Sequence, residues 1–152
     1  MKNIEYKNSS EGEDLLHLVT NIALEKKARD PVILDLRSLS AFTEYFIIVT
    51  ALNTRNVYAI VEEIKNYLKK NMDLQPLSID GLQECTWALI DYGYFFVHIF
   101  DEQTRNHYEI EKLWSKARVI EYNEKAALEI RQKTEKINLD NVSEINEKLS
   151  TD

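Results

Sequence analysis

Two short runs of almost continuously apolar residues constrain the fold of this chain more than any other feature. They occupy residues 32–36 and 45–50, and both are rich in β-branched or aromatic side chains, which favour strands. A strand with one face in water alternates apolar with polar residues, and these runs hardly alternate. The pattern therefore predicts two strands buried on both faces, in a sheet that is covered by helices.

Apolar residues at helical spacing, before and after these two runs, predict the covering helices. One stripe occupies residues 15–23, and we expect its helix to end at Asp30-Pro31, because the residue before a proline is pushed out of the α region. A second stripe occupies residues 57–68 and follows Asn53-Thr54, two residue types that cap helices. Each helix would have one apolar face to pack on the sheet.

The second half of the chain predicts further strands and a third helix. Tyr92-Gly93 separates two apolar runs and indicates a hairpin. The expected elements are strands at 76–79, 87–91, 95–100 and 119–122 and a helix from about Glu102 to Trp114. This order of elements predicts an α/β domain with a mixed sheet.

The character of the sequence changes after Tyr122. Aromatic residues are absent from 123–152, and the apolar residues there form only weak helical stripes. We therefore expect one domain over residues 1–122 and an appended tail over 123–152 that is helical or partly disordered. The length of 152 residues fits this organisation.

Composition excludes several classes of protein. The apolar runs are far shorter than the roughly 18 residues of a membrane-spanning helix, and the first fifteen residues contain no apolar stretch like that of a secretory signal. The single cysteine, Cys85, fits a reducing compartment. We expect a cytoplasmic protein without a membrane partner. The net charge of −7 argues against nucleic acid as the direct ligand.

The negative charge is concentrated in one segment. Residues 80–111 contain seven acids and one base, a net charge of −6. The acids are Asp80, Glu84, Asp91, Asp101, Glu102, Glu109 and Glu111, and the base is Arg105. This segment is a candidate docking surface for a basic partner.

Aromatic residues stand beside these acids, as is typical of the anchors of a protein interface. On one continuous helix Tyr108, Glu111 and Lys112 would share a face. Periodicity alone does not separate this interpretation from core aromatics with surface acids. The candidate partner-binding residues are Trp87, Asp91, Tyr92, Tyr108, Glu109, Glu111 and Trp114.

Motifs for catalysis or cofactor binding are weak. Neither a G-x-G-x-x-G nor a G-K-S/T motif occurs, and Cys85 lacks a recognised nucleophile signature. His98 lies inside a predicted strand and is interpreted as a semi-buried histidine. Asp35, Asp80 and Asp91 are alternative magnesium ligands, although no Asp-x-Asp occurs. We expect no catalytic residue, no cofactor and no metal site.

Several spaced motifs resemble the ribosomal silencing factors, the Iojap-related family, over about residues 12–122. The motifs are Leu34-Asp35-Leu36, Thr43-Glu44-Tyr45-Phe46-Ile47-Ile48, Asn53-Thr54-Arg55, Gly81 through Trp87, Leu89-Ile90-Asp91-Tyr92-Gly93, Val97-His98-Ile99-Phe100, and the helix carrying Arg105, Tyr108, Ile110, Glu111, Leu113 and Trp114.

The resemblance implies a function and a fold. Members bind the large ribosomal subunit through its fourteenth ribosomal protein, block joining of the small subunit and repress translation. Ribosomal RNA would be at most a peripheral contact, and a free homodimer is compatible with this function. The implied fold is similar to that of nucleotidyltransferases, with a mixed five-stranded sheet and without the catalytic apparatus.

Two other classes of function stay open at this stage. One is a magnesium-dependent, nucleotidyltransferase-like enzyme that uses Asp35, Asp80 or Asp91. The other is a self-associating scaffold, in which the aromatic and acidic surface would be the seam between two copies of the chain.

Overall fold

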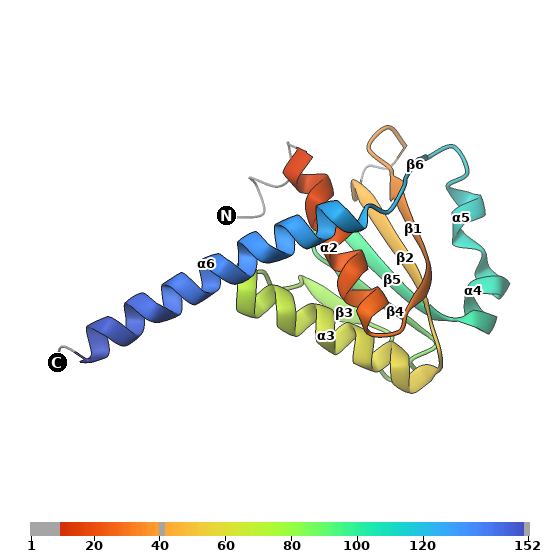
Figure 1. Cartoon of the computed structure of the whole chain (residues 1–152). Coiled ribbons are helices and arrows are strands. Elements are labelled where there is room, and N and C mark those ends of the chain that lie inside the picture. Colours follow the sequence, from red (N-terminus) through yellow and green to blue (C-terminus); the bar gives the residue numbers. More distant parts are fainter. Residues whose placement is uncertain (1–9, 40–41, 151–152) are drawn as a thin grey trace.

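A six-stranded mixed sheet forms the centre of the computed structural model, which describes residues 10–39 and 42–150 (Figure 1). The strands lie in the order β3-β4-β5-β2-β1-β6, and only the β2–β5 pair is parallel. The strands are β1 (Arg29–Asp35), β2 (Tyr45–Ala51), β3 (Ser78–Asp80), β4 (Trp87–Asp91), β5 (Phe95–Asp101) and β6 (Arg118–Ile120). The α/β class is confirmed, with six strands where the family resemblance implied five.

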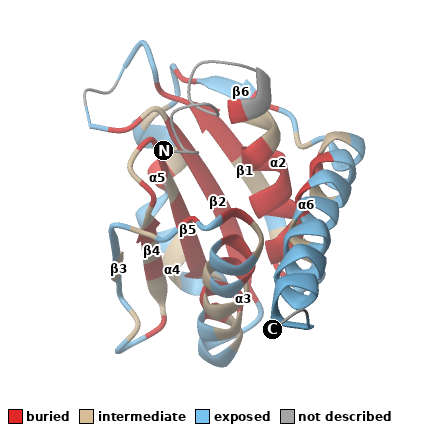
Figure 2. Ribbon diagram, turned by 90° about the vertical axis from the view of Figure 1, so that its left-hand side faces the viewer, coloured by how far each residue is buried: buried red, intermediate tan, exposed pale blue. Residues whose placement is uncertain are grey.

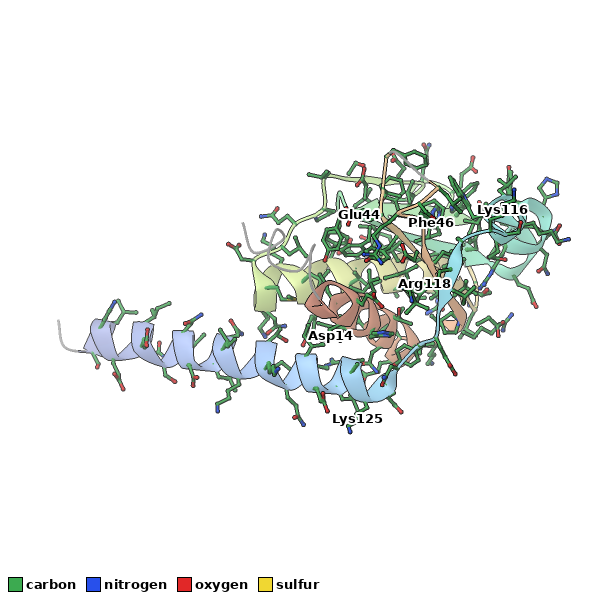
Figure 3. The ribbon with its side chains drawn as sticks, turned by 90° about the horizontal axis from the view of Figure 1, so that it is seen from above. Asp14, Glu44, Phe46, Lys116, Arg118 and Lys125 are labelled. Carbon is green, nitrogen blue, oxygen red and sulfur yellow. The ribbon has the colours of Figure 1, made fainter. Side chains whose placement is uncertain are left out.

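The two faces of the sheet are covered unequally. Helices α2 (Ser10–Glu25) and α3 (Thr54–Met72) and the start of α6 (Glu124–Ser150) lie over one face, above the larger core (Figure 1). Among the residues that the structure describes, the helices that cover the other face are the short α4 (Glu102–Tyr108) and α5 (Ile110–Leu113). In Figure 3, Lys125 and Asp14 mark α6 and α2 on one side, and Phe46 and Lys116 lie on the other.

Strand β2 is buried on both faces, as its apolar run predicts. All seven of its residues are buried. Ile47 and Val49 pack into the core under α2 and α3, whereas Phe46 and Ile48 pack into the smaller core on the opposite face. This alternation explains why the run shows no polar periodicity.

The ends of the helices match their predictions to different degrees. Asn53 caps α3 as predicted, because its side chain accepts a hydrogen bond from the backbone N–H of Asn56 at 2.8 Å. Helix α2 ends at Glu25, earlier than Pro31 predicts. Just after this end, Lys27 takes a left-handed conformation with φ of 74°. Pro31 instead lies in β1, at an irregularity in its pairing with β2, a position that tolerates a missing N–H.

Helix α6 begins on the domain and then leaves it. Its first half is packed on α2 and α3 through Ala127, Ile130 and Thr134, whereas residues 139–150 are all exposed (Figure 2). Arg131 fastens the packed half, because it donates hydrogen bonds to Asn21 Oδ1 at 2.9 Å and Glu25 Oε2 at 2.7 Å on α2. The division of the chain at residue 122 stays a prediction.

A cluster of charged side chains ties the last strand to the sheet and to α2. The carboxylate of Asp35 on β1 accepts hydrogen bonds from Arg37 Nη2 at 2.8 Å and from Arg118 Nη2 on β6 at 3.0 Å. Arg118 also reaches Glu13 of α2 at 3.2 Å. The hydrogen bonds from Arg37, followed by those from Arg118, lower the pKa of Asp35 to about 2.

We expect Asp35→Asn to lower the free energy of unfolding at pH 7 by about 1–2 kcal/mol, because the variant loses charge-assisted hydrogen bonds to half-exposed arginines. A lowered folded-state pKa stabilises the protein above the ordinary aspartate pKa, and this contribution is lost as the pH falls toward about 2. Urea unfolding of both proteins between pH 2 and 7 should therefore show a difference that shrinks below about pH 4.

The matched control is Asp30→Asn, whose exposed carboxylate lies 3.7 Å from Arg29 Nε. This control should change the stability by less than about 0.5 kcal/mol. Equal losses at the two positions would contradict the assignment of a special role to Asp35.

Candidate partner-binding face

The thinly covered face of the sheet carries a continuous group of aromatic rings, which we call the aromatic face. Neighbouring rings in it have centroids between 4.4 and 6.4 Å apart. Its members are Phe42, Phe46, Trp87, Phe96, His98, Phe100, Tyr108 and Trp114. Three of the candidate residues, Trp87, Tyr108 and Trp114, belong to it.

The end of the aromatic face near α4 is built around Trp87. Its ring is stacked on Phe100 at 4.8 Å and contacts Tyr108 at 5.0 Å. The indole Nε1 donates a hydrogen bond to Nδ1 of His98 at 3.1 Å. Trp87 is half-buried, and Tyr108 is 52% exposed, so part of the aromatic surface at this end is open to solvent.

The other end of the aromatic face is more open. The half-buried ring of Trp114 meets Phe46 edge-on at 5.7 Å and Phe42 at 6.2 Å. Phe42 is 61% exposed, and Leu113 beside Trp114 is 77% exposed. A shallow hollow of about 340 Å³ lies here, lined by Leu39, Leu113, Trp114, Ser115 and Lys116. Apolar side chains of a partner could be buried at this end.

The predicted single helix over residues 102–114 is wrong, because the helix breaks at Glu109. Glu109 has φ of 45°, and its N–H donates a hydrogen bond to the carbonyl oxygen of Arg105, which caps the end of α4. The break turns Ile110 into the smaller core. Tyr108 and Glu111 consequently lie on different helices and do not share one helical face.

Ion pairs and caps engage most of the clustered acids. Glu111 pairs with Arg105 at 3.1 Å, and Glu109 pairs with Lys112 at 3.0 Å. Asp91 accepts a hydrogen bond from the Gly93 N–H at 2.7 Å and closes the hairpin turn. Glu102 pairs with Arg29, and Asp101 caps α4. The acidic segment therefore presents fewer unengaged carboxylates to a partner than its composition predicts.

Tyr92 does not belong to the aromatic face. It is 3% exposed, lies in the larger core and stacks on Phe95 at 5.0 Å. Trp87 and Asp91 stand an even number of residues apart on β4 and point to one face, whereas Tyr92 follows at an odd spacing. Its prediction as a contact residue is therefore corrected, because its ring is covered by the protein itself.

Comparison with known proteins decides the family. The family model described as ribosomal silencing factor during starvation matches residues 9–148, which is most of the chain. The chain belongs to the ribosomal silencing factor family. The match extends through most of α6, beyond the motifs recognised in the sequence.

Individual members of the family agree with this assignment. A ribosomal silencing factor RsfS from Halalkalibacterium halodurans is 31% identical over 109 residues, which cover 72% of this chain and 92% of the relative. A mouse relative named mitochondrial assembly of ribosomal large subunit protein 1 is 28% identical over 102 residues, 66% of this chain and 45% of the relative. A crystal structure of a Bacillus halodurans protein has a TM-score of 0.63 at 30% identity, over 72% of this chain and 98% of that one.

The three aspartates considered as magnesium ligands are spread across this silencing factor's sheet. Asp35 on β1 and Asp80 on β3 are separated by four strand spacings, about 19 Å. Asp35 is also engaged by two arginines. Within residues 10–39 and 42–150, no group of three or more His, Cys, Asp or Glu side chains could hold a metal ion. In the same residues, no helix is long and apolar enough to cross a membrane.

Several residues of the aromatic face were missed by reasoning from the sequence. Phe96, His98 and Phe100 alternate along β5 and therefore point to one face. The period-two spacing was present in the sequence, but the thin cover of that face depends on where the helices pack. Phe42 lies outside every strand and helix, and no sequence signal pointed to it.

Gly81 holds the start of β4, and with it Trp87, in place. Its φ is 88°, and a Cβ at this position would collide with the carbonyl oxygen of Trp87. Gly93 has a similar φ of 94°, but a Cβ there would meet only Leu77 Cδ1 at 3.6 Å. The two glycines therefore share one backbone constraint and differ in packing.

We expect Gly93→Ala to cost about 1–2 kcal/mol of stability for the left-handed conformation. Gly81→Ala should cost about 1–3 kcal/mol more, because the backbone of β4 must move away from the new methyl group. Urea unfolding measures both, and tryptophan fluorescence should change more in the Gly81 variant. Equal losses of stability in Gly81→Ala and Gly93→Ala would contradict this expectation, because they would show that β4 moves away from the new methyl group at no cost.

Proposed function

We propose that this ribosomal silencing factor binds the large ribosomal subunit with its aromatic face and thereby keeps the small subunit from joining. The observation that carries the proposal is the aromatic face itself, a row of rings that the protein's own helices leave partly uncovered. The name of the mouse relative refers to the ribosomal large subunit, which supports the choice of subunit. Translation would be repressed because joined ribosomes cannot form.

A protein is a better partner for this face than RNA. Interface cores are rich in tryptophan, tyrosine and phenylalanine, as is the aromatic face. A platform for single-stranded RNA needs basic residues among its aromatics. Lys116 lines the hollow at one end of this face, but Asp91 and Glu109 are also neighbours. Lys112 and Arg105 are ion-paired with acids. We therefore propose the fourteenth ribosomal protein as the contact, with ribosomal RNA at most peripheral.

Aromatic anchors would supply most of the affinity, and the acidic segment would favour encounter with a basic protein. Most of the acids form an ion pair or cap a turn or a helix within the chain, so their contribution is expected in the association rate and in selectivity. The proposed contact residues are Trp87, Asp91, Tyr108, Glu109, Glu111 and Trp114. Tyr92 is left out because it is buried.

Inhibition would be steric, and no chemical step is required of the protein. We regard the sheet as a nucleotidyltransferase-like fold that works without a catalytic site, and the separation of Asp35 from Asp80 and Asp91 across the sheet supports this view. The proposed place of action is the cytoplasm, although the family also has a member with a mitochondrial name. A homodimer of the free protein is compatible with the proposal.

We expect Tyr108→Ala to weaken binding to purified large subunits by at least about 2 kcal/mol, roughly thirtyfold. The reason is that this ring is a half-exposed member of the aromatic face. Tyr58→Ala is the matched control, since Tyr58 is 49% exposed on α3, which covers the opposite face. Co-sedimentation measures the affinity, and light scattering measures the joining of subunits.

The wild-type protein in excess should suppress subunit joining, and the Tyr58 variant should suppress it equally well. Undisturbed joining in the presence of excess wild-type protein would refute the proposed function. Equal weakening of binding by Tyr108→Ala and Tyr58→Ala would contradict the proposal that the contact lies on the aromatic face.

A further inference from the structure

His98 lies at the centre of the aromatic face and is closed off from solvent. It is 5% exposed on β5. The ring of Phe46 meets it edge-on at 4.4 Å, and Phe100 lies parallel to it at 6.2 Å. Burial lowers the pKa of His98 to about 3, so the imidazole is neutral at physiological pH.

The two nitrogens of this imidazole have different surroundings. Nδ1 accepts the hydrogen bond from Trp87 Nε1 at 3.1 Å, so the proton of the neutral ring is on Nε2. Nε2 is buried and has no hydrogen-bond partner among the described residues. A buried unpaired donor destabilises the folded state, and a phenylalanine at this position would remove that donor.

The hydrogen bond therefore affects the orientation of Trp87 more than it stabilises the core. Trp87 is only half-buried, so packing restrains its ring incompletely, and the hydrogen bond from its N–H adds a directional restraint on the angle of the indole. The same ring contacts Tyr108 at 5.0 Å. A change in the angle of the indole would therefore move the exposed tyrosine as well.

We propose that His98 is a positioning residue, whose Nδ1 holds the indole of Trp87, and through it Tyr108, in the orientation that the partner binds. This inference rests on the proposed function, because the orientation matters only if the aromatic face is the contact. His98 itself does not touch the partner in this account, since the rings around it cover it.

Two substitutions separate the acceptor from the bulk of the ring. His98→Phe keeps a buried aromatic ring and removes the acceptor, so the Trp87 N–H loses its hydrogen bond. His98→Asn places Oδ1 near the position of Nδ1 and keeps the acceptor. The local readout is the ¹H–¹⁵N resonance of the Trp87 indole, identified by its disappearance in Trp87→Phe.

We expect the Phe variant to shift the Trp87 indole resonance upfield and to bind large subunits at least about tenfold more weakly, with an unchanged or higher Tm. The Asn variant should restore the indole resonance and most of the affinity, despite a lower Tm. If His98 acted only by stabilising the fold, the variant with the lower Tm would also bind large subunits more weakly. The Asn variant would then bind more weakly than the Phe variant, which is the reverse of the order that we expect.

His17→Phe is the matched control. His17 is a buried histidine on α2 whose Nδ1 accepts a hydrogen bond from the backbone N–H of Asn123 at 3.1 Å. Removing that acceptor should lower the Tm and leave the affinity for large subunits unchanged, because α2 lies on the opposite face of the sheet.

Two failures are distinguishable. Wild-type protein that does not bind large subunits would refute the proposed function, and this inference with it. Wild-type protein that binds, together with a His98→Phe variant that binds equally well, would refute only the positioning role. An indole resonance that does not respond to His98→Phe would also refute that role.

Discussion

The parallel pairing of β2 with β5 is the constraint on which the rest of the structure depends. Seven consecutive residue pairs join the two strands at the centre of the sheet. Both strands carry apolar side chains on both faces, so each face needs a cover. The crossover between them runs through α3, which lies with α2 and α6 on one face. Within residues 10–39 and 42–150, the opposite face receives a seven-residue and a four-residue helix, and its rings remain partly exposed.

The sequence was sufficient wherever a local signal agreed with the packing around it. The apolar run at 45–50 is a strand buried on both faces, the hairpin turns at Tyr92-Gly93, and Asn53 caps α3. In each case the residue types that favour the local conformation also satisfy its tertiary surroundings. Agreement of this kind across levels is what makes a fold predictable from one sequence.

Prediction failed where distant contacts decide the local conformation. Nothing in the sequence around Glu109 resembles a helix end, yet the chain breaks there because Ile110 is drawn into the smaller core. Arg105 reinforces the break, since its guanidinium reaches Thr50 Oγ1 at 2.8 Å and the Asp30 carbonyl at 2.7 Å. The error about Tyr92 is different, because the odd spacing between Trp87 and Tyr92 already placed the two rings on opposite faces.

Charge counted along a sequence is also a weak guide to charge on a surface. Of the acids between Asp80 and Glu111, two cap a turn or a helix and three pair with bases. A capping or paired carboxylate still contributes to the long-range field of the protein, but it is less available for a short contact with a partner. If the aromatic face is the contact, as proposed, the specificity of docking would depend on the shape and orientation of the rings as well as on charge. In the proposed mode of binding, the hydrogen bond from Trp87 to His98 would then be as important to recognition as the negative charge around it.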